Sequence, residues 1–249
     1  PVLHVDTNPD NPVIGDRSIS NDPKLVAKVG QQLIAGLQSQ GIVACGKHFP
    51  GHGDTQQDSH FELPRLPHAM DRMEEIELYP FAHVVGEDAK QGALAIMTAH
   101  VVFDAIHNEM PGTLCPEVLT DRLRKAMGFE GLCISDCMEM KAIADGAFWG
   151  GTVGACVRGI GAGLDMALVC HTHEVMHASI DAVDAALKDN TLSEARVAQA
   201  LARLERTRGF RRELRNSTIA PFEPSDAFRQ FISSSTATGA DPTWETVVG

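Results

Sequence analysis

Short apolar segments alternate with helical patterns along this 249-residue chain, and this alternation limits the folds open to it. Five segments have the length and apolar content of buried strands: Val2–Val5, Gly41–Gly46, Ala93–Thr98, Gly131–Ser135 and Met166–Cys170. They begin roughly 30–50 residues apart, the spacing of βα units with extended loops. Strands that repeatedly feed helices form a parallel sheet, which needs both faces covered or closure into a barrel. The chain is therefore expected to be an α/β protein.

The helices between these strands have recognisable ends. Asp22 precedes Pro23, and an aspartate N-cap followed by proline at the first helical position is a typical helix start. The predicted core-facing positions of this helix are Leu25, Val26, Val29, Leu33 and Leu37. Further helices are predicted over about 71–87, 116–127, 151–162 and 193–208, and an apolar run covers 174–187. Five strands cannot close an eight-stranded barrel, so an open sheet or part of a barrel is indicated.

The composition is that of an ordinary globular protein, with 43% hydrophobic and 22% charged residues. A formal net charge of −12 argues against nucleic acid and anionic membrane as partners, because both need a basic surface. No apolar run approaches the roughly 18 residues of a membrane span. Without an internal repeat or a dividing linker, one domain is expected over 1–210. A tail is expected over 211–249, with a short helix near 225–232 and then poor order.

The cysteines lack CxxC spacing and lie mostly in apolar segments: Cys45, Cys115, Cys133, Cys137, Cys156 and Cys170. We expect buried free thiols rather than a zinc pair at Cys133 and Cys137, because the first of these lies within an expected strand. Free thiols fit a reducing compartment, so a cytoplasmic location is expected. The chain opens at Pro1 inside an expected strand, which favours missing N-terminal sequence, and any signal peptide would be lost with it.

Polar residues follow four of the expected strands at the point where each strand ends: Lys47-His48, Thr98-Ala99-His100, Ser135-Asp136 and Cys170-His171. Polar groups at the carboxyl ends of parallel strands are typical of an active-site face. The first pair opens the densest titratable segment, Lys47–His60, which holds three histidines, two aspartates and two glycines. Glu139, shortly after the fourth strand, is expected to be an acid in the first turn of a helix. The chemistry of the chain is therefore expected at this end of the sheet.

The residue types leave several roles open. Asp136 could be a nucleophile, a base, a metal ligand or a structural cap. Asp58 and His60 are two residues apart on an expected loop, where the carboxylate can fix the imidazole tautomer by a hydrogen bond. His52 and His100 are expected to support loops. Proton transfer, nucleophilic attack and metal binding all remain compatible with this set.

A metal centre is the main alternative for the histidine-rich segment. Three histidines and two aspartates could ligate zinc. However, Lys47 adjoins His48, and a fixed ammonium disfavours a nearby dication. The sequence also contains no HExxH spacing for zinc and no G-x-S-x-G turn for a catalytic serine. We therefore expect no metal and no cofactor.

The segment KHFPGHGDTQQDSH over Lys47–His60 resembles the signature of glycoside hydrolase family 3 β-N-acetylglucosaminidases, which act in peptidoglycan recycling. The match is long and ungapped. Further segments resemble the family in the same order along the chain: Pro1-Val2-Leu3, Asn8-Pro9, Ile14-Gly15-Asp16-Arg17-Ser18, Thr98-Ala99-His100-Val101, Ile134-Ser135-Asp136, Gly163-Leu164-Asp165-Met166 and Asp241-Pro242-Thr243. The resemblance covers about residues 1–210 well and the tail loosely.

This resemblance implies a partial (β/α)₈ barrel with about strands four to eight present and the first three βα units missing. It implies that Asp136 is the nucleophile and that His60 is the general acid/base, oriented by Asp58. Histidine then replaces the second carboxylate of the usual retaining scheme, and its unperturbed pKa of about 6.5 suits proton transfer near neutrality. The residues expected to contact the sugar are Arg17, Lys47 and His48. The implied substrate is a small carbohydrate or muropeptide with terminal β-N-acetylglucosamine.

Two positions depart from the family pattern. The residue after the nucleophile is usually acidic, and here it is Cys137. Where the family often has an aspartate on the first strand, this chain has His4. The alternatives that stay open are a family 3 β-glucosidase, an N-acetylglucosaminide phosphorylase, a metal-dependent hydrolase built on the histidine-rich segment, and a non-catalytic carbohydrate-binding remnant. The sequence does not indicate an oligomeric state.

Overall fold

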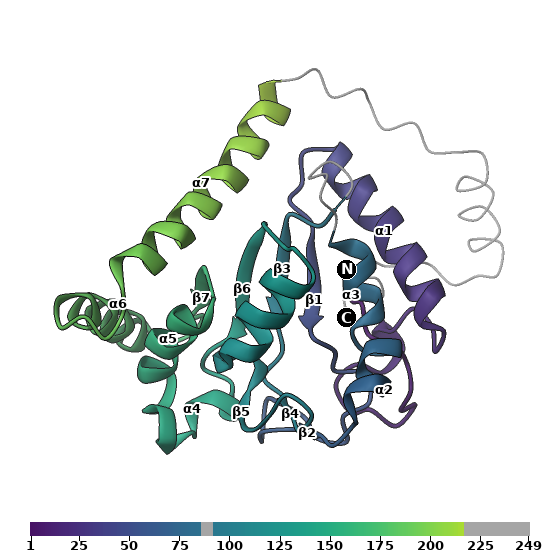
Figure 1. Ribbon diagram of the computed structural model, residues 1–249, viewed down its shortest axis with the longest axis horizontal. Helices are drawn as coiled ribbons and strands as arrows, with labels where there is room; N and C mark the ends of the chain where they lie inside the picture. Colours follow the sequence, from purple (N-terminus) through teal and green to yellow (C-terminus); the bar gives the residue numbers. More distant parts are fainter. Residues whose placement is uncertain (86–91, 217–249) are drawn as a thin grey trace, which may run out of the picture. The chain divides into compact units, whose positions relative to one another are not determined.

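The main sheet of the protein is parallel throughout. In the computed structural model, which describes residues 1–85 and 92–216, its strands are β1 (Cys45–Phe49), β3 (Ala95–Thr98), β6 (Leu132–Cys137) and β7 (Met166–Leu168). They lie in the order β1-β3-β6-β7, so each strand pairs with its predecessor in the sheet (Figure 1). Parallel neighbours require crossover connections, and helices supply them. The α/β prediction is therefore confirmed.

The first two predicted strands differ in detail from the observed ones. The segment 2–5 contacts β1 through a single parallel bridge between Val2 and Lys47, because Val5 turns away to pair with Ser20. The second strand begins four residues later than predicted. Gly41 ends the preceding helix with a φ of 76°, and the Ile42 N–H still bonds the Leu37 carbonyl at 3.1 Å. The apolar residues that were predicted to begin the strand therefore lie in the segment that ends the helix.

Helices flank the sheet where the patterns predicted them. They are α1 (Pro23–Ser39), the π-helical segment η3 (Glu117–Ala126), α5 (Gly151–Ala162), α6 (His173–Lys188) and α7 (Glu194–Asn216). The N-cap prediction for α1 is confirmed, because the Asp22 carboxylate accepts the Lys24 N–H at 2.9 Å. The predicted helix over 71–87 is two shorter ones, α2 (Met70–Glu75) and α3 (Tyr79–Val84). Pro80 lies in the first turn of α3, where a backbone N–H is not needed for a helical hydrogen bond. In the interior of one long helix the same proline would remove a hydrogen bond, so two helices form.

The buried face of α1 differs from the predicted one. Val26 is buried as expected, but the other buried positions are Ala27, Gly30, Ile34 and Gln38. The side chains of Leu25, Leu33 and Leu37 are 44%, 46% and 37% exposed. Both sets satisfy helical spacing, and the position of α1 against α3 selects between them. The prediction of Leu25, Leu33 and Leu37 as core residues was wrong.

Several short elements lie at the end of the sheet toward which β1 points (Figure 1). A second small sheet has the order β2-β4-β5, formed by β2 (Arg65–Leu66), β4 (Val102–Phe103) and β5 (His107–Pro111). These strands belong to the loops that follow β1 and β3, so they enlarge the carboxyl end of the main sheet. The remaining elements are the helix α4 (Lys141–Ala144) and the 3₁₀ turns η1 (Gly15–Arg17), η2 (Gly112–Leu114) and η4 (Ala147–Trp149).

The last helix is fixed to the sheet by one buried carboxylate. Asp165 is fully buried and accepts hydrogen bonds from Arg196 of α7 and from Arg124 of η3, both at 2.6 Å. Arg203 lies 3.3 Å from the same side chain. A buried charge needs such partners to offset its lost hydration. The helix was predicted to end at Arg208, but it runs to Asn216, and residues 1–216 form one compact unit.

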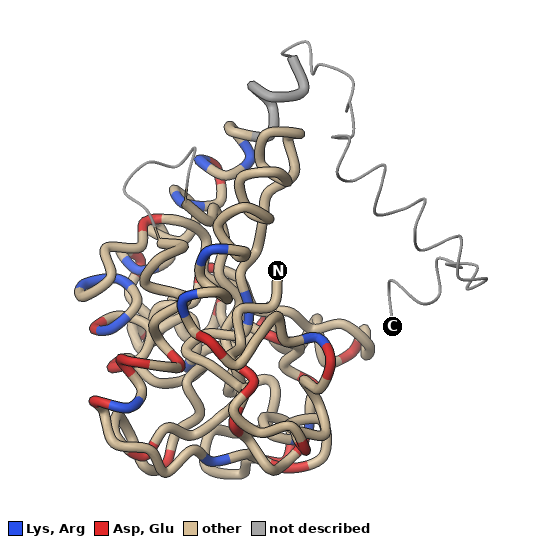
Figure 2. The backbone as a smooth tube through the Cα atoms, turned by 90° about the vertical axis from the view of Figure 1, so that its right-hand side faces the viewer, with Lys and Arg blue, Asp and Glu red and all other residues tan. Residues whose placement is uncertain are grey.

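Acidic residues outnumber basic ones by 33 to 21, and both kinds are interspersed along the described backbone (Figure 2). The net negative charge is therefore spread over many elements. None of the helices in the described parts of the chain has the length and apolar content that crossing a membrane requires. The tail was predicted over 211–249, but residues 211–216 belong to α7. The rest of the predicted tail, including the helix near 225–232, lies outside the described residues.

Candidate active site

The candidate site forms where the parallel strands end. His48, on β1, and Asp136, on β6, approach one another with 3.5 Å between His48 Nε2 and Asp136 Oδ2. These strands are not neighbours, because β3 lies between them. Adjacent strands are about 4.8 Å apart, so the two side chains meet over the end of β3. The structure therefore brings together two residues that are far apart in the sequence.

Asp136 is held at one oxygen, and its side chain is partly exposed. Its Oδ1 accepts the Cys137 N–H at 2.8 Å, and its side chain is 29% exposed. Burial pushes the pKa of Asp136 upward, but His48, His100, the Cys137 N–H and Lys47 outweigh that effect, and the pKa is lowered overall. The carboxylate is therefore ionised at neutral pH, which is the state required of a nucleophile.

His4 links the backbone of the site to the His48 ring. The His52 backbone N–H donates to His4 Nδ1 at 2.9 Å, and the His48 backbone N–H donates to His4 Nε2 at 3.2 Å. His4 Nε2 also lies 2.8 Å from His48 Nδ1. Burial lowers the pKa of His48 to about 3 and that of His4 well below its usual range, so both rings are neutral.

His100 supports the end of β6 rather than a loop. Its Nε2 donates to the Cys137 carbonyl at 2.9 Å, and its Nδ1 lies 2.8 Å from Thr113 Oγ1. The ring is 1% exposed, and burial lowers its pKa. Because Cys137 adjoins the nucleophile candidate, this bond restrains the backbone beside Asp136.

Asp58 and His60 form a hydrogen-bonded pair on an exposed loop. His60 Nδ1 lies 2.7 Å from Asp58 Oδ1, which also accepts the His60 N–H at 2.8 Å. Burial raises the pKa of Asp58, but these two bonds and the charge of His60 lower it overall. The His60 side chain is 59% exposed, and among the contacts of the described residues none joins it to Asp136. Its Nε2 is thus open to a ligand.

The loop that carries this pair is anchored at its centre. Ser59 is buried, its Oγ lies 3.2 Å from His52 Nε2, and its carbonyl accepts the Ala142 N–H at 3.3 Å. His52 also bonds Thr55 Oγ1 at 2.6 Å through Nδ1. A side chain at Gly53 would place Cβ 2.1 Å from the Val5 carbonyl oxygen, so only glycine allows this approach. These contacts support the loop role predicted for His52.

The two predicted sugar-binding cations border the site without bonding Asp136. Arg17 donates to the Val13 carbonyl at 2.6 Å, and it lies near enough to His4 and His48 to lower their pKa values. Lys47 is half-buried and contributes to the lowered pKa of Asp136. Both positive charges are therefore available to a ligand at the strand ends.

Two structural residues were missed or misassigned from the sequence. Asn11 is buried. Its side-chain amide donates to the carbonyls of His52 and Gly53 and to Thr55 Oγ1, at 2.9 to 3.2 Å. Only its place in an Asn/Pro-rich segment hinted at this role. Glu139 precedes α4 and does not lie in its first turn, so that prediction was wrong. Its carboxylate accepts the backbone N–H groups of residues 170–172 and ties the loop after β7 to β6.

The histidine-rich segment does not form a metal-ligand group. Across residues 1–85 and 92–216, one set of three or more His, Cys, Asp or Glu has its ligand atoms within 4.8 Å of one another: Cys137, Glu139 and His171. The proposed ligands of the alternative hydrolase, His48, His52, Asp58 and His60, do not meet this spacing. Cys133 is fully buried in β6 and is not part of the set. The metal-dependent hydrolase therefore has no support from the geometry.

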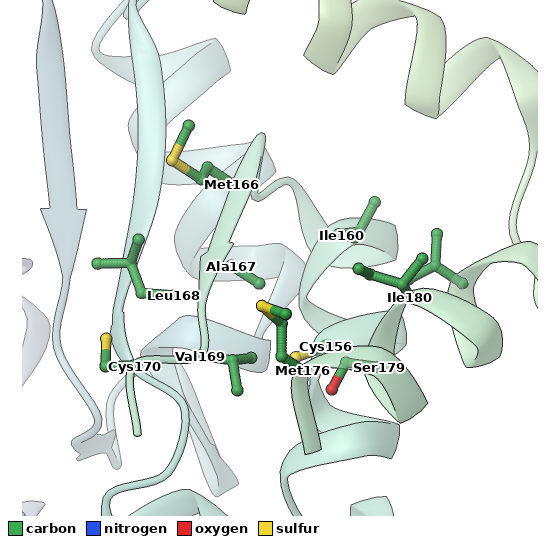
Figure 3. Close-up of a pocket in the computed structure, with 11 residues that line it drawn as sticks. Cys156, Ile160, Met166, Ala167, Leu168, Val169, Cys170, Met176, Ser179 and Ile180 are labelled. Atoms are coloured by element: carbon green, nitrogen blue, oxygen red, sulfur yellow. The ribbon is translucent and has the colours of Figure 1, made fainter. Parts of the chain in front are cut away.

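A separate apolar pocket of about 450 Å³ lies between β7, α5 and α6. Figure 3 shows its lining, which includes Cys156, Met166, Met176 and Ile180, with Cys170 at one end. None of the predicted site residues lines it. It is apolar throughout most of its surface and offers no charged group for sugar chemistry.

Comparison with known proteins agrees with this geometry. Residues 1–207 match the family described as glycosyl hydrolase family 3 N terminal domain. The chain is 39% identical over 171 residues to a β-hexosaminidase of Shewanella frigidimarina, covering 69% of this chain and 48% of the relative. It is 35% identical over 180 residues to β-hexosaminidase A of Pseudoalteromonas piscicida, covering 68% of this chain and 29% of the relative.

Solved structures give the same result. The structure of a glycoside hydrolase family 3 β-N-acetylglucosaminidase from Paenibacillus sp. str. FPU-7 superposes with a TM-score of 0.81 at 38% identity, covering 91% of this chain and 41% of that one. A β-glucoside phosphorylase, BglX, has a TM-score of 0.75 at 22% identity, covering 89% and 40%, a likeness that shows the fold alone. The chain thus spans less than half the length of these relatives. By its sequence match and its fold, the chain belongs to glycosyl hydrolase family 3.

Proposed function

We propose that this chain carries the chemistry of a retaining β-N-acetylglucosaminidase, which removes terminal non-reducing β-N-acetylglucosamine from peptidoglycan fragments. The observation that carries the proposal is the pairing of an ionised, partly exposed Asp136 with a neutral His48 at the strand ends. The Asp58–His60 pair adds a proton donor on a neighbouring loop. The β-hexosaminidase names of the relatives agree with this substrate class.

In the first step, an oxygen of Asp136 attacks the anomeric carbon as the glycosidic bond breaks. His60 gives its proton to the leaving oxygen, and Asp58 stabilises the protonated ring. In the second step, water attacks the same carbon, His60 takes the proton of the water, and the Asp136 ester bond breaks. Two displacements retain the configuration. Arg17, Lys47 and His48 are proposed to hold the sugar hydroxyls.

The sheet is proposed to be an arc of a (β/α)₈ barrel that corresponds to about strands four to eight. Its strand order follows the chain order, as consecutive barrel strands do. The outer apolar stripe of α1, at Leu25, Leu33 and Leu37, is exposed and fits the contact that a neighbouring barrel helix would make. The same (β/α)₈ arrangement accounts for the site at the strand carboxyl ends.

The test is turnover of an aryl β-N-acetylglucosaminide by the protein and its variants. Asp136→Ala is expected to lower kcat by about 10⁴-fold or more, because the covalent step is lost. His60→Ala is expected to lower it by about 10²–10⁴-fold with a poor leaving group and less with an activated one. Asp71→Ala and His177→Ala, both exposed and distant in sequence from the site, serve as matched controls. Asp136→Ala with most of its activity intact would overturn the nucleophile assignment.

The same assay separates the alternatives. Preference for a glucoside over an N-acetylglucosaminide would indicate a β-glucosidase, and a requirement for phosphate would indicate a phosphorylase. Activity lost on chelation would indicate a metal-dependent hydrolase, and carbohydrate binding without turnover would indicate a non-catalytic protein. The cytoplasmic location expected from the free thiols is part of the proposal and is tested by cell fractionation.

A further inference from the structure

A cluster of metal-ligating side chains lies beside the candidate site and takes no part in the proposed chemistry. Cys137, Glu139 and His171 place one ligand atom each within 4.8 Å of the others. The Cys170 thiol adjoins the cluster through a side-chain hydrogen bond with Cys137. The four residues come from the carboxyl ends of β6 and β7 and the loops that follow. Two sulfurs, one imidazole and one carboxylate are thus gathered in one place.

The backbone holds these groups in register. Cys137 is paired with Leu168 on the neighbouring strand, which places Cys170 two residues beyond that pair. Glu139 accepts the N–H groups of Cys170, His171 and Thr172 at 2.6 to 3.0 Å. The Thr172 side chain adds a further hydrogen bond to the same carboxylate, which fixes the position of Glu139. The loop that carries Cys170 and His171 is therefore fixed relative to Cys137.

We propose that Cys137, Cys170, His171 and Glu139 form a binding site for a thiophilic divalent cation, with Zn²⁺ as the best match. Zinc takes four ligands from sulfur, nitrogen and oxygen donors, whereas Mg²⁺ and Ca²⁺ prefer oxygen alone. The ring of His171 is exposed and makes no hydrogen bond among the described residues, so it is free to turn toward a cation. The negative charges of Glu139 and Asp136 both act on this region and favour a cation there.

Cation binding here requires the loss of thiol protons. A cation must displace these protons, so affinity is expected to increase with pH. This dependence distinguishes thiolate ligation from adsorption to the carboxylates alone.

A cation at this position acts on the neighbouring nucleophile candidate. The Cys137 N–H is bonded to Asp136 Oδ1, and the Cys137 carbonyl is bonded to His100. A dication on the Cys137 sulfur adds positive charge beside Asp136 and weakens its attack. Inhibition by zinc therefore follows, and this consequence rests on the proposed function, whereas the binding site does not.

The experiment is a titration of the reduced full chain with Co²⁺ under anaerobic conditions, because thiolate-to-cobalt charge transfer is visible by absorption. One equivalent is expected to bind with such a band, and Zn²⁺ is expected to displace it. Cys137→Ser, Cys170→Ser and His171→Ala are expected to weaken binding by at least about tenfold, since each removes a ligand. His173→Ala, two residues beyond and also exposed, is the matched control and should bind like the unaltered chain.

The proposal fails if no thiolate band develops, or if His171→Ala and Cys137→Ser bind Co²⁺ as tightly as the unaltered chain. Circular dichroism establishes that Cys137→Ser is folded, and the exposed His171→Ala variant provides the test if it is not. Turnover is then measured with and without Zn²⁺. A chain that shows the cobalt band but no turnover contradicts the proposed function and leaves the metal site supported.

Discussion

At the residue scale, His4 stands where the family often has an aspartate, and this difference affects the charge of His48. His4 is neutral, and its Nε2 lies 2.8 Å from His48 Nδ1. An aspartate at the same position would carry a negative charge. It would accept a proton from His48 Nδ1 and stabilise the imidazolium. The identity of residue 4 therefore affects the protonation of His48.

We predict that His4→Asp raises the pKa of His48, because a carboxylate favours the charged ring. Titration of the His48 ring signals by NMR is expected to move up from about 3 by at least about one unit. The acid limb of the kcat/KM profile should shift in the same direction. His177→Asp, on the exposed face of α6, is the control and should leave the His48 titration unchanged. A His48 titration that stays in place would contradict this electrostatic effect of residue 4.

At the scale of a secondary-structure element, α1 shows that periodicity identifies a helix but does not choose its buried face. Two apolar stripes satisfy helical spacing, and neighbouring residues on them have opposite environments. Ile34 is 0% exposed, whereas Leu33 is 46% exposed. Contact with α3 buries the first stripe. The two residues differ in environment while sharing the helix, its caps and its length.

This contrast gives a prediction for adjacent substitutions. Ile34→Ala should destabilise the chain by about 2–5 kcal/mol, because it removes buried contacts and leaves a cavity. In this 249-residue chain, where Leu33 is exposed, Leu33→Ala should change the free energy of unfolding by no more than about 0.5 kcal/mol. Urea denaturation followed by circular dichroism measures both. Equal losses from the two variants would mean that the outer stripe is also covered in solution.

At the scale of the whole molecule, four buried histidines make stability depend on pH. Burial lowers the pKa values of His4, His48, His52 and His100, to about 3 for His48 and about 4 for His52. The unfolded chain binds protons at these histidines near the usual pKa of about 6.5, whereas the folded chain does not. Their effect on stability is therefore favourable to folding above about pH 6.5 and is lost as pH falls toward 4.

We predict that the urea midpoint falls steadily between about pH 6.5 and pH 4. Each histidine that stays neutral in the fold adds up to about 1.4 kcal/mol per pH unit to the slope. His52→Gln should reduce this slope, whatever its effect on stability at neutral pH. His177→Gln, at an exposed position, should not alter it. A midpoint that is constant over this interval would contradict the buried neutral state of these rings.

The sequence alone determined the features that depend on near neighbours. The strand and helix alternation, the Asp22 cap, and the placement of His48, His100 and Asp136 at strand ends all follow from local periodicity and local hydrogen bonding. The Asp58–His60 bond belongs to the same class, because only one loop residue separates its partners. The strands of the second sheet escaped prediction because β2 and β4 are only two residues long, too short for alternation to be visible.

Only the tertiary structure decided which distant groups meet. The bond from His4 to His48 joins positions 44 residues apart, and the contact of His48 with Asp136 passes over the end of β3. Glu139 serves a loop about thirty residues away, and Asp165 gathers arginines from two helices. Such contacts depend on strand register and on the path of the chain, which local sequence does not encode. The sequence determined which functional groups are present, and tertiary packing determined which of them lie close together.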